Sequence, residues 1–269
     1  MDEIAITARV MAYMRSLDVE VSGDIFAHHF VTDEAKSLAD SWLAVYPGNA
    51  RHGALRCRYM EGRAATYIQR GALQMINIAA GLNTFPYRHP AARALQYFAE
   101  FDLPNMLTYK EETVRRLITE GMIPSTTLKV SYHVADLTAD ITPVLEQLCW
   151  DWSHPTVVLM EGISYYIPRA ALQAVIHTLG RFCAKGSVII FDYLRIKDTK
   201  TPLYKTFYDS IAPRGEVFHT VFDDEGVVRL FTPWFRVISD RTITDIEKEY
   251  CADQRTIDFA SYLVAERTA

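Results

Sequence analysis

The most informative residues of this 269-residue chain are acids that directly follow short apolar segments. Glu100 and Asp102, Asp136 and Glu161 each stand at the end of such a segment, and Gly81 ends an earlier one. A glycine lets a ligand approach the backbone closely, because no Cβ blocks it. An acid at a strand end can accept hydrogen bonds from both hydroxyls of a ribose, and a second acid can accept from the amino group of adenine. The pattern therefore predicts a site for a nucleoside-like ligand.

Each of these residues could instead have a purely structural role, because a glycine often only makes a turn and an acid often caps a helix. The sequence has no phosphate loop and no G-x-G-x-x-G, which disfavours a diphosphate nucleotide and an NAD-dependent oxidoreductase. Acids around the site would repel phosphate and suit a cation, so S-adenosylmethionine with its sulfonium fits best. The four cysteines lie far apart without the spacing of a zinc site, so no metal is predicted.

Apolar segments and helix signals alternate through the middle of the chain. Buried strands are predicted at 73–79, 96–102, 128–133, 156–160 and 187–191. Helices are predicted at about 56–70, from Pro104 toward Gly121 and from Pro168 to Gly186. This alternation is typical of a doubly wound, mostly parallel, Rossmann-like α/β sheet, which binds ligands at the carboxyl ends of its strands.

The two ends of the chain differ from this middle. The first 70 residues are predicted to be helical. Two late strands at 234–238 and 261–265 are expected to pair antiparallel at a sheet edge. The intervening prolines and aromatic residues predict an insertion that folds over the sheet. We expect one domain composed of a helical cap, a cofactor-binding core, a lid and the final strands, with the bounds 1–55, 56–194, 195–233 and 234–269.

The composition of the chain disfavours nucleic acids and membranes as binding partners. Lys and Arg total 28 against 33 Asp and Glu, a net charge of -5, so no basic surface for nucleic acid is expected. No apolar run approaches the roughly 18 residues of a membrane span. The acidic start Met-Asp-Glu-Ile lacks the pattern of a signal peptide, so a cytoplasmic location without membrane partners is expected.

Four sequence blocks resemble the leucine carboxyl methyltransferase family of S-adenosylmethionine-dependent methyltransferases and its bacterial small-molecule relatives. Residues 74–88 (QMINIAAGLNTFPYR) are similar to the family's Q-V-V-x-L-G-A-G-L-D-T-R-x-Y-R. Residues 155–167 (PTVVLMEGISYYI) resemble its P-T-x-x-x-x-E-G-L-x-x-Y-L. The other two blocks are 55–61 (LRCRYME), which looks like an arginine-bearing helix, and 100–104 (EFDLP) with Lys110.

The resemblance implies roles for individual residues. Arg56, rather than Arg58, matches the arginine that pairs with the methionine carboxylate. Asp102 matches the acid on the ribose, and Glu161 matches the acid near the methionine end of the cofactor. The remaining cofactor-binding positions that the resemblance implies are Ala79, Gly81, Asp136 and Leu137, the last two beside the adenine.

Three positions depart from the family pattern. Ala79 stands where the family has a glycine, and its methyl group fits if the backbone there is not left-handed. Asn83 and Phe85 replace an Asp and an Arg, which removes an ion pair expected beside the cofactor.

The resemblance favours methylation of a carboxylate on a small molecule or a peptide C-terminus. A carboxylate is ionised at pH 7 and needs no general base, whereas a hydroxyl would need one. No motif places His133, His154 or His219 for that role, so hydroxyl O-methylation in secondary metabolism stays an alternative. A third alternative is a cofactor-binding cyclase or scaffold that transfers no methyl group.

The acceptor is expected to contact aromatic residues. Tyr165 and Tyr166 follow Glu161 closely and are candidates for contact with the substrate. Further aromatic residues that could line an apolar acceptor site are Tyr204, Phe207, Tyr208, Phe218, Phe222 and Trp234.

Overall fold

A seven-stranded sheet forms the centre of the protein. The computed structural model describes residues 6–212 and 217–268. Strands β1 to β5 are parallel, and β7 runs antiparallel between β5 and the edge strand β6, giving the order β3-β2-β1-β4-β5-β7-β6. The strand bounds are β1 Gln74–Ile78, β2 Tyr97–Asp102, β3 Lys129–Val134, β4 Thr156–Met160, β5 Val188–Tyr193, β6 Phe235–Thr242 and β7 Ser261–Arg267.

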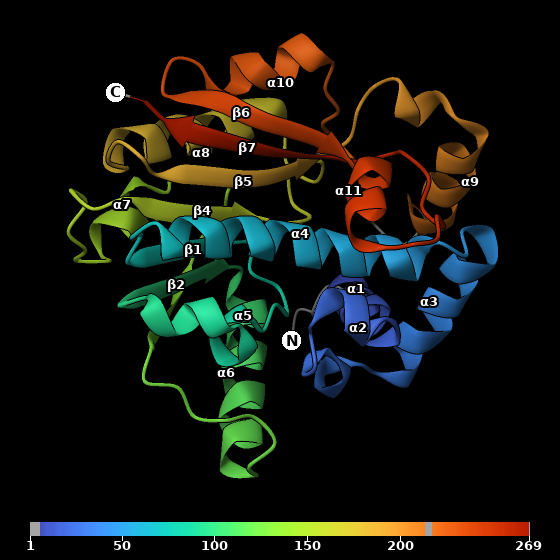
Figure 1. Ribbon diagram of the computed structural model, residues 1–269, viewed down its shortest axis with the longest axis horizontal. Helices are drawn as coiled ribbons and strands as arrows, with labels where there is room; N and C mark the ends of the chain where they lie inside the picture. Colours follow the sequence, from blue (N-terminus) through green and yellow to red (C-terminus); the bar gives the residue numbers. More distant parts are fainter. Residues whose placement is uncertain (1–5, 213–216, 269) are drawn as a thin grey trace.

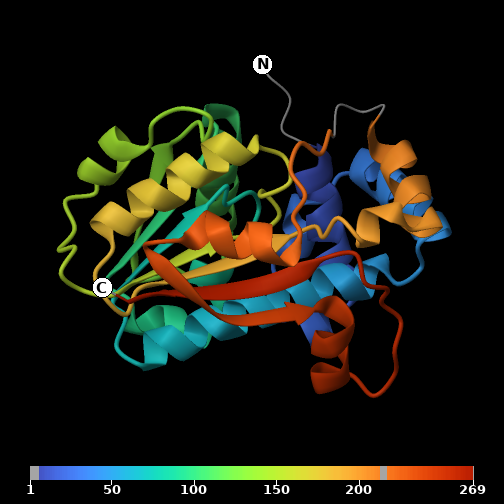
Figure 2. The same ribbon diagram turned by 90° about the horizontal axis from the view of Figure 1, so that it is seen from above.

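Helices cover both faces of the sheet and one of its ends (Figures 1 and 2). The first helices, together with α9, lie beyond the carboxyl ends of the parallel strands, where they form the cap. The helix bounds are α1 Ile6–Leu17, α2 Val19–Ser22, α3 Asp33–Val45, α4 Asn49–Gln69, α5 Phe85–Arg88, α6 Pro104–Thr119, α7 Thr142–Glu146, α8 Arg169–Phe182, α9 Pro202–Ile211, α10 Asp224–Phe231 and α11 Ile243–Tyr250, with short 3-10 turns at Ala27–Phe30, Pro90–Ala94 and Asp198–Lys200.

The doubly wound sheet predicted from the sequence is confirmed, including the late antiparallel pair. The largest difference is α4, which begins at Asn49 instead of near residue 56. Gly48 permits this early start, because a Cβ there would lie 2.0 Å from the carbonyl oxygen of Arg255. The expected boundary between residues 55 and 56 therefore falls inside one continuous helix. Helix α8 begins after Pro168 as predicted but ends at Phe182, before Gly186.

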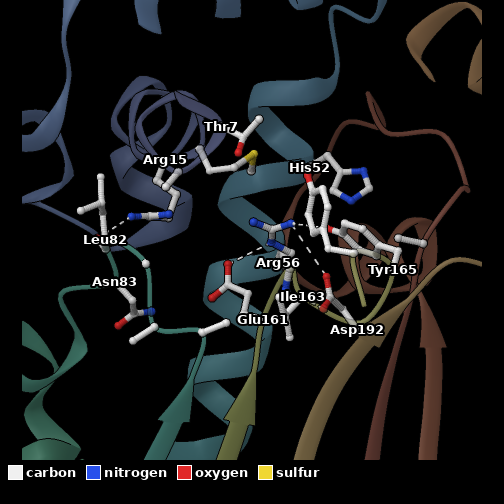
Figure 3. A pocket seen from close by; sticks show the side chains of 18 of the residues that line it. Thr7, Arg15, His52, Arg56, Leu82, Asn83, Glu161, Ile163, Tyr165 and Asp192 are labelled. Carbon is white, nitrogen blue, oxygen red and sulfur yellow. Dashed lines mark hydrogen bonds and ion pairs between the residues drawn. The ribbon is translucent and has the colours of Figure 1, made fainter. Parts of the chain in front are cut away.

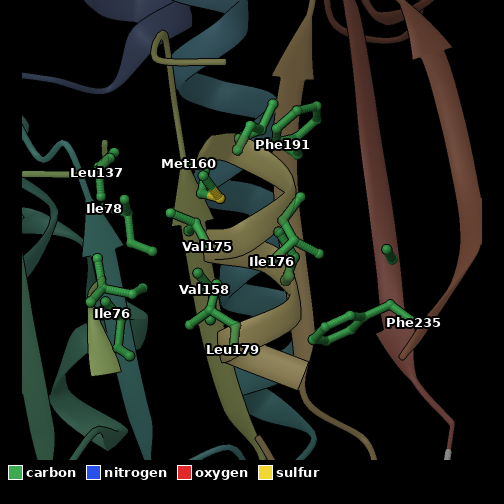
Figure 4. Packing of buried hydrophobic residues seen from close by; sticks show 14 of the residues in the cluster. Ile76, Ile78, Leu137, Val158, Met160, Val175, Ile176, Leu179, Phe191 and Phe235 are labelled. Carbon is green, nitrogen blue, oxygen red and sulfur yellow. The ribbon is translucent and has the colours of Figure 1, made fainter. Parts of the chain in front are cut away.

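Two apolar layers hold the helices to the sheet. On one face, side chains of β1, β4 and β5 pack against α8, as Figure 4 shows for Ile76, Val158 and Phe191. On the other face, residues such as Met75 and Val157 pack against α4 and α11. All residues of β1, β4 and β5 are buried, which explains their continuous apolar runs.

Strand register brings the predicted site residues to one level. Ile78 pairs with both Phe101 and Met160, so the residues that follow these strands come out side by side. Met160 in turn pairs with Phe191, which brings Glu161 level with Asp192. The strand order reverses between β1 and β4, and open sheets bind ligands at that point.

The length and polarity of the helices decide whether any of them could span a membrane. Within residues 6–212 and 217–268, every helix is too short or too polar to cross a bilayer.

The packing of α8 against Trp234, the residue before β6, yields a stability prediction. A Cβ at Gly180 would lie 2.4 Å from Cγ of Trp234, so Gly180→Ala overpacks this contact. We expect it to lower the free energy of unfolding in urea by about 1–3 kcal/mol. The matched helical substitution Gly62→Ala should raise that free energy by roughly 0.5–1 kcal/mol, because only the Tyr250 hydroxyl lies nearby, at 3.9 Å. Equal effects of the two substitutions would contradict this packing.

Candidate active site

A cavity of about 380 Å³ lies at the carboxyl ends of β1 and β4, beneath the helical cap. Its walls come from α1, α3, α4, α9, the strand ends and the segment at 259–260. Many of the residues singled out from the sequence line it: Arg56, Ala79, Gly81, Asn83, Asp102, Glu161, Tyr165, Tyr166, Phe207 and Phe218. Residues more than 100 positions apart in the chain thus share one cavity.

The guanidinium of Arg56 occupies the middle of this cavity (Figure 3). Its Nε donates to Oε1 of Glu161 at 2.9 Å, and Nη1 lies 3.8 Å from Oδ2 of Asp192. Nη1 also donates to the hydroxyl of Tyr165 at 3.3 Å. Gly162 packs against the guanidinium, where a Cβ would lie 3.4 Å from Nη1. One buried cation is therefore held between two carboxylates at the ends of β4 and β5.

Asp192 was not among the residues predicted from the sequence. Its Oδ1 accepts a hydrogen bond of 2.7 Å from the backbone N–H of Gly162. Burial raises the pKa of the Asp192 carboxyl to about 6, although Arg56 and the Gly162 N–H oppose this shift. The signal that could have identified it is its position, since Phe191 ends the run Ser187–Phe191 and an acid follows, as after the other strands.

Asp102 is tied to the glycine turn on the neighbouring strand. Its Oδ2 accepts from the N–H of Gly81 at 2.7 Å, and its Oδ1 accepts from the N–H of Leu103 at 2.8 Å. The N-cap of α6 is Leu103 and makes no side-chain capping bond, so the alternative that Asp102 caps this helix is wrong. Burial raises the pKa of Asp102, and both backbone N–H groups oppose that rise.

The methyl group of Ala79 was expected to fit if the backbone there is not left-handed. In the structure the backbone at Ala79 is left-handed. Its φ is 52°, a value that costs an alanine roughly 1–2 kcal/mol relative to glycine. Gly81 also has a positive φ of 47°, and a Cβ there would find only the Ala79 carbonyl oxygen, 4.0 Å away. The space around Gly81 thus belongs to the cavity, while Ala79 holds the same turn under strain.

Buried ion pairs beside the cavity do not depend on positions 83 and 85. Arg88 donates to Glu61 at 2.6 Å and to Asp24 at 3.1 Å. Asn83 donates its amide to the same Glu61 at 2.9 Å. Asn83 and Phe85 cannot form the ion pair of the family pattern, but Arg88 in the next turn forms buried ion pairs in the same region.

Arg15 of α1 is a second cavity cation that the sequence interpretation missed. It pairs with Asp24 at 2.8 Å and donates to the carbonyl oxygen of Leu82 at 2.9 Å. The bond to Leu82 fixes α1 against the loop that follows β1, as Figure 3 shows. In the sequence, Arg15 stands among the apolar residues of the first predicted helix, and no motif marked it as buried.

Asp136 and Leu137 are absent from the cavity lining that the structure describes. Asp136 is exposed, and its Oδ1 accepts from the backbone N–H and the hydroxyl of Thr138. Leu137 is buried in the apolar layer beneath α8. Their placement beside an adenine stays a prediction.

Two of the six further aromatic residues expected around the acceptor line the cavity. Phe207 of α9 and Phe218 line the cavity, whereas Phe222 is in the core layer and Trp234 packs against that layer. Tyr204 and Tyr208 pack in the layer on the α4 face. Of the two helices that fall within the predicted insertion, α9 packs on α3 and α10 packs on α8.

The histidine in the cavity is His52, not one of those named from the sequence. His133, His154 and His219 do not line the described cavity. Burial, together with the charge of Arg56, lowers the pKa of His52 to about 3, so its ring is neutral at pH 7. Within the described residues, no group of three or more His, Cys, Asp or Glu side chains is arranged to hold a metal ion.

Residues 3–180 match the family profile of leucine carboxyl methyltransferase. This chain belongs to that family. A relative from Streptomyces coelicolor, named as an S-adenosyl-L-methionine-dependent methyltransferase without a stated substrate, is 28% identical over 225 residues, 75% of this chain and 71% of the relative. A relative of the same name from Mycolicibacterium gilvum is 28% identical over 141 residues, 52% of this chain but only 44% of its own length.

Solved structures share the fold. A DUF574 family protein from Streptomyces avermitilis superposes with a TM-score of 0.71 at 14% identity, covering 97% of each chain. Magnesium protoporphyrin IX methyltransferase from Synechocystis, solved with bound S-adenosylmethionine, gives 0.52 at 9% identity over 96% of this chain and 97% of its own. The sheet is therefore that of Rossmann-like methyltransferases.

The contact between Asp102 and Gly81 yields a binding prediction. Asp102→Asn leaves one backbone N–H facing an amide nitrogen, so the free energy of unfolding should fall by about 1–3 kcal/mol. The affinity for S-adenosylhomocysteine, measured by calorimetric titration, should fall at least tenfold, about 1.4 kcal/mol. Asp140→Asn makes the same change at an exposed acid outside the cavity lining, whose Oδ1 accepts from the N–H of Thr142, and should leave that affinity unchanged. Affinity of wild-type strength in Asp102→Asn would contradict the assignment.

Because the backbone at Ala79 is left-handed, replacing this alanine with glycine should not lower the stability of the protein. Ala79→Gly relieves the strain, while the added freedom of the unfolded chain costs roughly 0.4–1 kcal/mol. We expect urea unfolding to show a stability unchanged or raised by up to about 1 kcal/mol. The neighbouring Ala80→Gly, where φ is not positive, should instead lower stability by at least about 0.5 kcal/mol. Equal losses in both variants would show that the strain is absent.

Proposed function

We propose that the protein is an S-adenosylmethionine-dependent O-methyltransferase that methylates a carboxylate of a small molecule. The observation that carries this proposal is the row of charged groups along the cavity: Asp102 beside Gly81, then Glu161, Arg56 and Asp192. Family membership supports the same cofactor, which the relatives' names also state.

In the proposed complex, the ribose hydroxyls bind Asp102 and the methionine end lies near the buried cluster. The methionine carboxylate would pair with Arg56, and Arg15 adds a second positive charge to the same cavity. The methionine amino group would donate to Glu161. Leu82, Leu103 and Met106 provide an apolar wall beside Asp102 that suits the adenine ring.

Methyl transfer then requires alignment more than proton transfer. The acceptor oxygen must lie about 3 Å from the methyl carbon, in line with the departing sulfur. A carboxylate acceptor is already ionised, and the cavity histidine, His52, is a poor base because its pKa is lowered to about 3. This favours a carboxylate over a hydroxyl.

One observation favours hydroxyl O-methylation as the second candidate. Asp192 lines the cavity, and its pKa of about 6 suits a general base near neutral pH. A phenol or alcohol bound against Asp192 could lose its proton there as the methyl group is transferred.

The two acceptors predict different pH profiles. With a carboxylate acceptor, kcat should stay within threefold from about pH 5.5 to 8.5, since the substrate is ionised throughout. With a hydroxyl acceptor and Asp192 as base, kcat falls toward tenfold per pH unit below about pH 6, where the Asp192 carboxylate takes up a proton. Transfer of a labelled methyl group to panels of acids and phenols measures both profiles.

Asp192→Asn provides the control for this comparison. It should leave the profile flat for a carboxylate acceptor and nearly abolish turnover of a hydroxyl acceptor. A rate on carboxylates that climbs tenfold per pH unit would overturn the proposed reaction.

A further inference from the structure

Three side chains at one end of the cavity carry polar atoms without a hydrogen-bond partner in the described part of the chain. These atoms are Nε1 of Trp42, Nδ2 of Asn49 and Nδ1 of His52. Each side chain belongs to a residue that is no more than 5% exposed. A fourth unpaired atom of the cavity lining, Nδ2 of Asn77, lies on β1. Buried polar groups are almost always paired in folded proteins, so these unpaired atoms around one cavity call for a partner that enters it.

Aromatic contacts join Trp42 and His52 through Phe207 and Phe259, and Asn49 lies one turn before His52 on α4. We call these five residues the distal chamber: Trp42, Asn49, His52, Phe207 and Phe259. The Trp42 and Phe207 rings are 5.4 Å apart between centroids, and Phe207 and Phe259 are 5.8 Å apart. His52 lies 4.9 Å from Phe259. The chamber therefore has apolar walls with three polar groups among them.

The distal chamber is continuous with the buried cluster through α4. Asn49, His52 and Arg56 are spaced by three and four residues, so they lie on one face of this helix. The seven-residue span from Asn49 to Arg56 corresponds to roughly 10 Å along the helix axis. A molecule that reaches from Arg56 to the end of the chamber is therefore elongated.

The unpaired atoms are all hydrogen-bond donors. The indole and amide nitrogens can only donate. Nε2 of His52 lies 2.9 Å from the hydroxyl of Tyr262, for which the described residues offer no other acceptor, so the hydroxyl donates to Nε2. The neutral imidazole then carries its proton on Nδ1.

The charge of the chamber selects the kind of oxygen it can hold. None of its five residues is ionised at pH 7, and Arg56, the cation that acts on His52, is already paired with Glu161. A second carboxylate would be buried there without a counterion, which is unfavourable. A neutral carbonyl oxygen can accept two of the three donors at no such cost.

We infer that the methyl acceptor is an elongated, largely aromatic molecule whose end remote from the methylated group carries a carbonyl oxygen, held by donors of the distal chamber. This inference rests on the proposed function, because it takes the Arg56 end of the cavity as the place of methyl transfer. It names Trp42, Asn49 and His52 as residues that determine specificity.

Neighbouring contacts hold the chamber in shape. The hydroxyl of Tyr46 accepts from the N–H of Ile257 at 2.8 Å, and Glu247 accepts from the N–H groups of Arg255 and Thr256. These bonds fix the segment that delivers Phe259 to the start of α4. The chamber is thus built before any acceptor binds.

Two probes of matched shape test the inference: 4′-acetylbiphenyl-4-carboxylate and 4′-isopropylbiphenyl-4-carboxylate. The second carries a methyl group in place of the carbonyl oxygen at the remote end. Calorimetric titration into the full chain saturated with S-adenosylhomocysteine should show at least tenfold tighter binding of the acetyl probe. In Trp42→Phe this preference should fall by at least threefold. His177→Phe removes another buried unpaired nitrogen, on α8 outside the cavity, and should keep the preference.

Equal affinities in the wild type, or no binding of either probe, would overturn the inference. So would a preference that survives in both Trp42→Phe and a second variant, Asn49→Leu, which also serves if the first fails to fold. A purely structural role of Trp42 predicts lower stability in Trp42→Phe with an unchanged probe preference, whereas recognition predicts that the preference falls. Binding of S-adenosylhomocysteine, measured before any probe is added, tests the proposed function separately. The probe preference can also be measured in the absence of S-adenosylhomocysteine.

Discussion

A positive charge buried between two carboxylates is the interaction on which the rest of the cavity depends. Arg56 is 9% exposed and contacts Glu161 and Asp192, which end two neighbouring parallel strands. Removing one partner of such a cluster leaves an uncompensated buried charge, which is strongly unfavourable. The helix that carries Arg56 must therefore cross the strand ends at this point, and its 21 residues span from the cap to the sheet.

The same helix joins the two halves of the cavity. Toward its amino end, α4 presents His52 and Asn49 to an aromatic chamber, and at Arg56 it meets the charged strand ends. The glycine turn after β1 faces this helix across the cavity and is held by Asp102, at the cost of a strained backbone at Ala79. Strain of this kind persists where surrounding contacts fix the backbone, and such positions cluster at functional sites.

The sequence predicted the sheet well because its signals are local. Fully buried strands such as Thr156–Met160 read as continuous apolar runs, and the acids that follow them fall at one edge by the geometry of parallel pairing. The start of α4 could not be predicted, because it depends on Gly48 meeting the backbone of Arg255 more than 200 residues later. The left-handed Ala79 likewise follows from long-range contacts, since nothing local favours that backbone.

The candidate site was predicted only where it follows the strand ends. Asp192 was missed because the predicted strand stopped at Phe191, and Arg15 because it lies on the apolar face of a cap helix. His52 lies one helical turn before Arg56, so the position of that arginine could have revealed it. The unpaired polar atoms depend on packing between α3, α4 and α9, which no spacing in the sequence encodes.

The central claim is that S-adenosylmethionine binds along this row of charged groups, with its methionine carboxylate on Arg56. Calorimetric titration of S-adenosylhomocysteine into the wild type and into Arg56→Met tests it most directly, with thermal unfolding of both proteins to confirm that the variant is folded. The account predicts saturable binding by the wild type and an affinity at least thirtyfold weaker in the variant, about 2 kcal/mol. Equal affinities in two folded proteins, or no binding by the wild type, would contradict it.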